Sequence, residues 1–143
     1  MLQPRHTVRN LATRVHSVLF RRTGGRFGRR LLGAPVLVLE TRGRTSGKPR
    51  SVPLLFVEDG GDWVVMASSG GDPRHPSWFT NLEAEPRGIV ITDAGRRPVA
   101  AIVTNGAERE RLFGRLAAVY SGFEDYRERT TREIPVVRLR PEG

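Results

Sequence analysis

The sequence predicts a mainly β protein in which about six short antiparallel strands form one small barrel. Short apolar runs, such as Val36–Leu39 and Val52–Val57, are separated by glycine-rich turn signals, which is typical of strands joined in hairpins. Helical periodicity is confined to a few segments. A chain of 143 residues is long enough for one domain with a substantial core.

The strands are expected at 36–41, 50–58, 63–67, 89–92, 99–103 and 136–139. The second and third are joined by Asp59-Gly60-Gly61-Asp62, a strong tight-turn signal because two-residue hairpin turns need positive φ at their centre. A later hairpin is expected to turn across Ala94-Gly95-Arg96. Strands that follow one another in sequential hairpins favour an antiparallel barrel.

Three segments carry helical signals. Residues 77–84 follow Pro76 and end before Pro86, as short helices often do. Residues 108–120 place Leu112, Leu116 and Val119 on one face. Near the N-terminus, apolar residues recur at spacings of three and four and define a basic amphipathic helix: Val8, Leu11, Ala12, Val15, Val18 and Leu19. We therefore divide the chain into this helix, residues 1–25, and a single barrel domain, residues 26–143.

The composition excludes several kinds of site. Cysteine is absent, so the chain has no disulfide framework and no thiolate metal site. His6, His16 and His75 show no ligand spacing, and we expect no metal. No apolar run approaches the length of a membrane span, and a cytoplasmic location is expected.

Positive charge is concentrated at the start of the chain. Residues 1–50 hold 12 cations and one acid, whereas residues 51–143 hold 12 cations and 14 acids. A nucleic acid, an anionic membrane surface or a polyanionic small ligand could each explain this excess. No aromatic residues interleave the cations as a base-stacking platform would require, so nucleic acid is not expected. The N-terminal helix either packs onto the domain or lies on the inner face of the cell membrane.

The most informative segment is Gly43-Arg44-Thr45-Ser46-Gly47-Lys48-Pro49-Arg50, the turn of the first hairpin. It carries three cations, among them the only lysine of the chain. Glycines allow backbone N–H groups to approach a ligand, a serine adds a hydroxyl, and the cations supply charge. The turn is either a cradle for phosphate and carboxylate groups or an arginine-rich, solvated hairpin tip.

Four motifs in order carry a resemblance to a known family. They are Gly43-Arg44-x-Ser46-Gly47-x-Pro49-Arg50-x-Val52-Pro53-Leu54, Ala67-Ser68-x-Gly70-Gly71, His75-Pro76-x-Trp78-x-x-Asn81-Leu82-x-Ala84-x-Pro86 and Tyr126-x-x-x-Thr130-x-Arg132-x-Ile134-Pro135-Val136-Val137. Over about residues 15–140 the chain resembles the deazaflavin-dependent nitroreductase family of actinobacteria. The resemblance implies a split β-barrel of the flavin-reductase and pyridoxamine-phosphate-oxidase type. It also implies coenzyme F-420, an 8-hydroxy-5-deazaflavin with a phosphate and an oligoglutamate tail.

The resemblance assigns cofactor contacts to these motifs. Phosphate and tail would be held by Arg44, Ser46, Gly47, Lys48 and Arg50. The ring would be lined by Val52 and Pro53, and approached by Ala67, Ser68, Gly70 and Gly71. The third motif would lie beside the cofactor, where His75 could position its phosphate or side chain. Trp78 and Asn81 belong to the same set, although Trp78 is better explained as a core anchor, and Asn81 could equally cap a helix or orient a loop.

The family chemistry is hydride transfer from the reduced cofactor to an electron-poor acceptor such as a quinone, enone or nitro compound. Relatives use tyrosines in the C-terminal region to shape the acceptor pocket and donate a proton, and Tyr126 and Tyr120 are the candidates here. A spacing of three would put both on one helical face with Phe123. Phe123 lies where a nitroreductive relative can carry tyrosine, which argues against efficient nitroreduction and leaves quinone or enone reduction open. A core role for Tyr120 and Phe123 explains them equally well.

Alternatives remain at this point. The protein could bind the deazaflavin as a carrier without turnover, or use flavin mononucleotide (FMN) or haem, as other branches of the barrel superfamily do. It could be a monomer or a homodimer. A membrane quinone as acceptor would explain the basic amphipathic helix.

Overall fold

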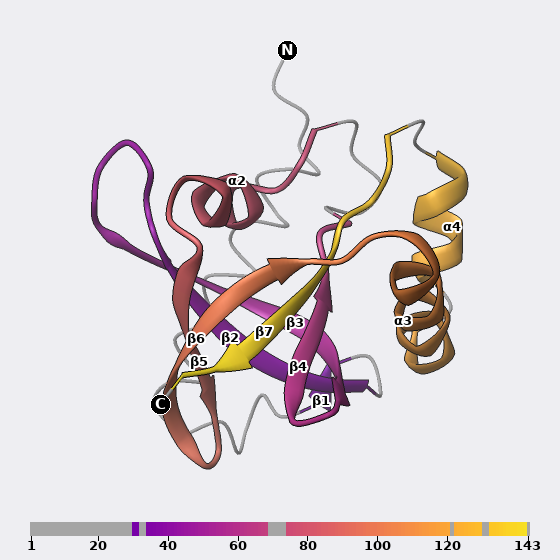
Figure 1. The fold of residues 1–143 in the computed structure, drawn as a ribbon, viewed down its shortest axis with the longest axis horizontal. Coiled ribbons are helices and arrows are strands. Elements are labelled where there is room, and N and C mark those ends of the chain that lie inside the picture. Colours follow the sequence, from indigo (N-terminus) through magenta and orange to yellow (C-terminus); the bar gives the residue numbers. More distant parts are fainter. Residues whose placement is uncertain (1–29, 32–33, 69–73, 121, 130–131, 143) are drawn as a thin grey trace.

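The computed structural model describes residues 30–31, 34–68, 74–120, 122–129 and 132–142. Its strands form one antiparallel sheet in the order β1-β2-β3-β4-β7-β6-β5, and β2 also pairs with β5, which closes the sheet into a barrel (Figure 1). The strands are β1 (Arg30–Leu31), β2 (Ala34–Arg42), β3 (Pro49–Asp59), β4 (Asp62–Met66), β5 (Arg87–Thr92), β6 (Gly95–Val103) and β7 (Val136–Pro141). The predicted mainly β class and the six antiparallel barrel strands are confirmed.

The barrel closes where β5 approaches β2 very closely. Val38, Leu39 and Glu40 pair with Ile91, Val90 and Ile89. A Cβ atom at Gly88 would lie 2.7 Å from the Glu40 carbonyl oxygen. Since real Cβ atoms do not approach oxygen so closely, only glycine allows the two strands to come together at this point.

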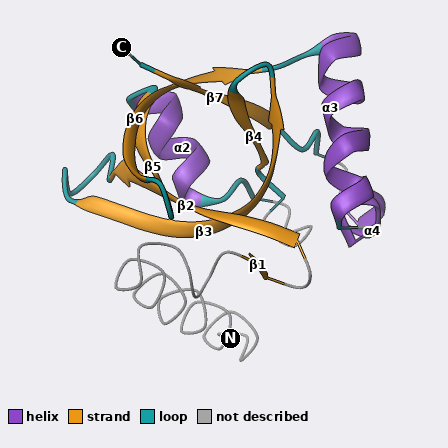
Figure 2. Ribbon diagram, turned by 90° about the horizontal axis from the view of Figure 1, so that it is seen from below, coloured by secondary structure: helices purple, strands orange, loops and turns teal. Residues whose placement is uncertain are grey.

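The barrel interior is filled from the strands and from one helix. Side chains alternate between the two faces of a strand, so Leu37 and Leu39 enter the interior core. Helix α2 (Ser77–Ala84) adds Trp78, Phe79 and Leu82 to the same core. Figure 2, which looks along the barrel, shows α2 within the ring of strands. Helix α2 therefore closes one end of the barrel.

Two further helices cover part of the outer surface. Helices α3 (Gly106–Val119) and α4 (Gly122–Arg129) lie beside the barrel (Figure 2). They pack against the outward side chains of β3, β4 and β7 in a second core cluster: Val57, Val64, Met66, Leu112, Phe113, Leu116, Phe123, Ile134 and Val136.

Several predicted boundaries were right and others wrong. The helix over 77–84 and the turn at Gly60-Gly61, with φ of 58° and 85°, are confirmed. The second turn is one residue earlier than predicted, because Thr92 already pairs with Gly95. The helix predicted at 108–120 begins at Gly106, and Val119 is 36% exposed rather than buried. Strand β1 and helix α4 were not predicted as elements.

The N-terminal helix predicted at 1–25 lies outside the described residues. Within the described part of the chain, no helix is both long and apolar enough to cross a membrane.

Candidate cofactor-binding site

The β2–β3 turn is a tight loop closed by backbone hydrogen bonds. The Gly43 N–H donates to the Lys48 carbonyl at 2.8 Å, and the Gly47 N–H donates to the Gly43 carbonyl at 2.8 Å. Gly47 has a φ of 71°, which favours glycine. A Cβ atom at Gly43 would lie 2.7 Å from Ser46 Oγ and 3.3 Å from the Lys48 carbonyl. Gly43 therefore leaves no room for a side chain, whereas Gly47 supplies the positive φ that the turn requires.

Ser46 organises the charged side of this turn. Its Oγ accepts hydrogen bonds from the Lys48 N–H at 3.2 Å and from Arg50 Nη2 at 3.5 Å. A hydroxyl has two acceptor lone pairs and one donor. Both lone pairs are used within the turn, so the hydroxyl can engage a ligand only as a donor, as an anion requires.

Four cations surround the turn, and all are exposed: Arg42, Arg44, Lys48 and Arg50. Within the described residues, none of the four forms an ion pair with a carboxylate, although Arg42 Nη1 donates to the Gly47 carbonyl at 3.2 Å. We refer to Arg42–Arg50 as the basic turn. Its charge is not neutralised by this part of the protein, and its donor set fits phosphate and carboxylate groups.

Asn81 fixes the basic turn to α2. Its Oδ1 accepts from the Arg44 N–H at 3.1 Å and from Arg44 Nη1 at 3.0 Å. Its Nδ2 donates to Thr41 Oγ1 at 3.1 Å, and the residue is 3% exposed. Asn81 thus orients a loop, one of the two roles that its sequence position left open.

The end of β4 reaches the same end of the barrel as the basic turn. β3 begins after that turn and pairs antiparallel with β4, so the residues after Met66 lie toward it (Figure 1). Ala67 is fully buried and Ser68 is 9% exposed. The Ala67 N–H donates to the Pro135 carbonyl at 2.9 Å. Gly70 and Gly71, predicted beside these residues, lie outside the described part of the chain.

The two predicted ring-lining residues of β3 face opposite sides. Val52 packs against the interior core and pairs with Leu39, whereas Pro53 pairs with Val38. Both are partly buried. Because consecutive side chains of a strand alternate, only their shared backbone can present one common edge to a ligand.

His75 is joined to the end of β4 by an arginine that our sequence-based list of site residues omitted. Arg132 Nη1 lies 3.1 Å from His75 Nδ1, and Arg132 Nη2 donates to the Ser68 carbonyl at 2.7 Å. His75 also stacks at a tilt on Phe79, with ring centroids 5.0 Å apart. Arg132 appeared only as part of the fourth motif, because a contact across 57 and 64 residues leaves no local signal.

Several predicted aromatic residues prove to be core residues. Trp78 is 7% exposed within the interior core and stands edge-on to Phe79, so its ring has little free surface for stacking. Tyr120 caps the C-terminus of α3 and packs edge-on against Phe123, which is 5% exposed. The prediction that Tyr120 shares one helix with Phe123 and Tyr126 is wrong, since Tyr120 is the C-cap of α3 and α4 begins at Gly122. Tyr126 lies on α4, and its side chain is not described.

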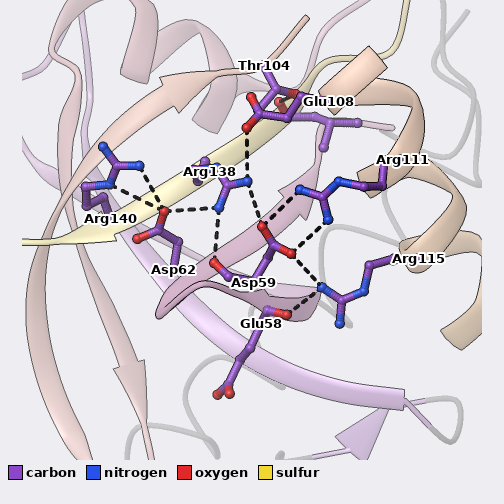
Figure 3. A network of polar contacts seen from close by, with 10 residues as sticks. Glu58, Asp59, Asp62, Thr104, Glu108, Arg111, Arg115, Arg138 and Arg140 are labelled. Atoms are coloured by element: carbon purple, nitrogen blue, oxygen red, sulfur yellow. Dashed lines mark hydrogen bonds and ion pairs between the residues drawn. The ribbon is translucent and has the colours of Figure 1, made fainter. Parts of the chain in front are cut away.

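A second arginine cluster lies at the opposite end of β3 (Figure 3). Arg138, buried on β7, donates to Asp59 at 2.8 Å and to Asp62 at 3.1 Å. Arg111 and Arg115 from α3 also pair with Asp59, at 2.9 Å and 3.1 Å. Hydrogen bonds from Arg111 and then Arg138 hold the pKa of Asp59 well below its ordinary value. We refer to Asp59, Asp62, Glu108, Arg111, Arg115, Arg138 and Arg140 as the paired cluster, because each of its arginines forms an ion pair with one of its carboxylates.

An open cleft of about 530 Å³ lies between α3, α4 and the segment before β7. Of its three lining arginines, Arg109 and Arg127 both pair with Glu110, whereas Arg132 contacts His75 and the Ser68 carbonyl. No group of three or more histidine, aspartate or glutamate side chains in the described residues could hold a metal ion. The basic turn is thus the cationic surface best suited to an anionic ligand.

Comparisons with known proteins show the family and the fold of the chain. The sequence profile of the F-420H2-dependent quinone reductase family matches residues 12–141. An F-420H2-dependent quinone reductase of Mycobacterium tuberculosis is 36% identical over 132 residues, covering 88% of this chain and 87% of that protein.

Solved structures show the same fold. An F-420H2-dependent reductase superposes with a TM-score of 0.68 at 37% identity, covering 77% of this chain and 97% of the other. A structure described as a domain-swapped dimer superposes with a TM-score of 0.69 at 34% identity, covering 96% of this chain and 99% of the other. A haem storage protein of Vibrio cholerae, at 14% identity and a TM-score of 0.59, shares the split-barrel fold alone. The chain belongs to the F-420H2-dependent quinone reductase family, and is therefore an oxidoreductase whose cofactor is coenzyme F-420.

Proposed function

We propose that this protein transfers a hydride from reduced coenzyme F-420 to a quinone, and that the basic turn holds the anionic part of the cofactor. The observation that carries the second part is a set of four exposed cations without carboxylate partners among the described residues. Hydrogen bonds within the turn and to Asn81 hold its backbone in one conformation, which would lower the cost of ordering it around an anion.

Within the basic turn, each residue has a distinct role. Arg44, held by Asn81, and Lys48 and Arg50 supply charge to the phosphate and the glutamate carboxylates. Ser46 donates its hydroxyl, and Gly47 keeps the backbone open. The deazaflavin ring would extend from there past the backbone of Val52 and Pro53 toward Ala67 and Ser68.

When bound, the reduced deazaflavin supplies the hydride from its carbon 5. The quinone gains that hydride and one proton and becomes a hydroquinone, while the cofactor is oxidised. The protein has to orient the two partners and exclude water. We keep Tyr126 on α4 as the candidate proton donor, and Tyr120 as a residue that supports α4 through Phe123.

The competing function is a carrier that binds the cofactor without turnover. The two functions differ in one observable, which is oxidation of the bound reduced cofactor by an acceptor. Protein loaded with F-420H2 should be mixed with a soluble naphthoquinone, an enone and a nitroaromatic compound, while the absorbance of oxidised cofactor is followed. Rapid oxidation with the quinone supports the proposal. Oxidation no faster than without protein, for every acceptor, would leave the carrier role.

The assembly we propose is a homodimer. The structural neighbour described as a domain-swapped dimer spans almost the whole chain at 34% identity, which supports this assembly. Analytical ultracentrifugation of the purified protein would test it, and a single species of monomer mass would contradict it.

We also propose that residues 1–22 bind the surface of an anionic membrane, which would bring the enzyme to a membrane quinone. The supporting observation is the sequence itself, in which the apolar residues of this segment fall on one helical face and arginines fall mostly elsewhere. Liposome flotation with and without residues 1–22 tests this point. Unchanged flotation after truncation would contradict it.

A further inference from the structure

We infer that Arg132 is a positioning residue that holds His75 in the tautomer with its proton on Nε2, so that His75 offers a neutral N–H donor to the cofactor. This inference rests on the proposed function, because it assigns the donor to F-420. It adds Arg132 to the site and specifies the tautomer of His75.

The tautomer follows from the contact between the two side chains. Arg132 Nη1 lies 3.1 Å from His75 Nδ1. A guanidinium can only donate hydrogen bonds, so Nδ1 must accept. An accepting Nδ1 carries no proton, and the one proton of the neutral ring is then on Nε2. A protonated ring would lose the acceptor and place two cations in contact.

Through a second contact, Arg132 connects three segments of the chain. Its Nη2 donates to the Ser68 carbonyl at 2.7 Å, at the end of β4. His75 precedes α2, and Arg132 itself precedes β7. The fork of the guanidinium therefore joins the backbone after β4 to the imidazole before α2 with fixed relative geometry.

The imidazole ring of His75 also packs against an aromatic ring. Phe79, which is 5% exposed on α2, lies with its ring centroid 5.0 Å from that of His75 at an interplanar angle of 58°. His75 itself is exposed. With Nδ1 engaged and one side against Phe79, Nε2 is the ring atom left for a ligand at the cofactor end of the barrel.

The first test needs no cofactor. Protein with ¹⁵N-labelled histidine is studied by long-range ¹⁵N–¹H NMR at neutral pH, and His75→Gln assigns the signal. The expected result is a protonated Nε2 and an unprotonated Nδ1 in the wild type, a mixed tautomer in Arg132→Leu, and restoration in Arg132→Lys. A wild-type His75 protonated on Nδ1 would overturn the inference.

The second test asks whether the Nε2 donor contacts the cofactor. Glutamine at position 75 can place an amide donor near the position of Nε2, whereas asparagine reaches only the position of Nδ1. The dissociation constant for F-420 should therefore rise by about three- to tenfold in His75→Asn and by clearly less in His75→Gln. Equal losses in the two variants, in folded protein, would overturn the donor role.

The third test separates positioning from direct charge attraction. Arg132→Leu is combined with His75→Asn in a double-mutant cycle. If Arg132 acts through His75, its loss should weaken binding less in the asparagine background than in the wild type. Strict additivity would overturn the inference. Absence of F-420 binding by the wild type would instead refute the proposed function. The NMR experiment would still test the tautomer of His75, because it uses no cofactor.

Discussion

The barrel carries two arginine clusters at opposite ends of β3, and they differ in what their charges contact. The paired cluster joins Arg111, Arg115, Arg138 and Arg140 to Asp59, Asp62 and Glu108. The basic turn presents Arg42, Arg44, Lys48 and Arg50 to solvent without an acid in the described residues. Arginine thus forms internal ion pairs in the paired cluster, whereas in the basic turn we propose that it binds a ligand.

Burial explains this difference. Arg138 and Asp62 have side chains only 8% and 7% exposed, and a buried charge is tolerated only when it is paired. The cations of the basic turn remain hydrated, so they need no partner to be tolerated. Their mutual repulsion costs some stability, which an anionic ligand can offset.

The largest effect should come from removing charge at the basic turn. Lys48→Ala with Arg50→Ala should weaken F-420 binding by about 3–6 kcal/mol, taking about 1.5–3 kcal/mol for each hydrogen bond to a charged group. The free energy of unfolding should change little, because both residues are exposed and lack carboxylate partners. Fluorescence titration at low and high salt measures the loss, which should be greater at low salt.

The matched control removes two cations from the paired cluster. Arg111→Ala with Arg115→Ala changes the net charge equally but should leave F-420 affinity within about twofold, since the turn and α3 lie far apart along β3. If both double variants weakened binding equally, the basic turn would act only through net charge.

Breaking the paired cluster should have the next largest effect, and on stability rather than on binding. Arg138→Met leaves the buried Asp62 without its buried partner and should lower the free energy of unfolding by about 3 kcal/mol. Urea denaturation measures this. The conservative control, Arg140→Met, removes a partner that is 58% exposed and should cost less than about 1 kcal/mol. Equal losses would mean that burial does not set the strength of the cluster.

A smaller effect is expected where α2 meets the basic turn. Asn81→Leu removes the bonds to Arg44 and Thr41, and should cost about 1–2 kcal/mol in F-420 binding and a similar amount in stability. Asn81→Asp keeps an acceptor for Arg44 but pairs this cation with a carboxylate, so it should also weaken F-420 binding. Retained affinity in the leucine variant would show that Arg44 needs no orientation.

The smallest expected effect is on how the free energy of unfolding changes at acidic pH. The lowered pKa of Asp59 means that its carboxylate stabilises the fold above its ordinary value of 3.8, and that this contribution is lost as the pH falls through the lowered value. Asp59→Asn should therefore be less stable than the wild type at neutral pH, and the difference should shrink below about pH 4. Urea midpoints across the pH range measure it, and a constant difference would contradict the assignment.

Local signals predicted much of the fold. Gly60-Gly61 specified its turn through positive φ, and Pro76 and Pro86 bracketed α2. Helix α4 was missed because its eight residues are mostly charged and carry little apolar periodicity. The end of α3 was predicted correctly at Tyr120, which is its C-cap residue, and Gly122 shortly after it is a usual signal for a helix end.

The site was predicted as a set of motifs but not as a set of contacts. The charge of the basic turn was visible in the sequence, whereas its attachment to Asn81 spans 37 residues. The link from Arg132 to Ser68 spans 64. Such contacts form because the closed barrel brings together the residues after β4, the segment before β7 and the segment before α2. The spacing of these residues along the chain does not predict this arrangement.

The most direct test of the central claim compares two ligands on two proteins. Wild type and the Lys48→Ala, Arg50→Ala variant are titrated with F-420 and with the same deazaflavin lacking phosphate and glutamate tail. We predict that the wild type binds F-420 far more tightly than the stripped ring, and that the variant reduces this preference by at least about a hundredfold. A preference that survives in the variant would place the anionic part of the cofactor elsewhere and contradict the account.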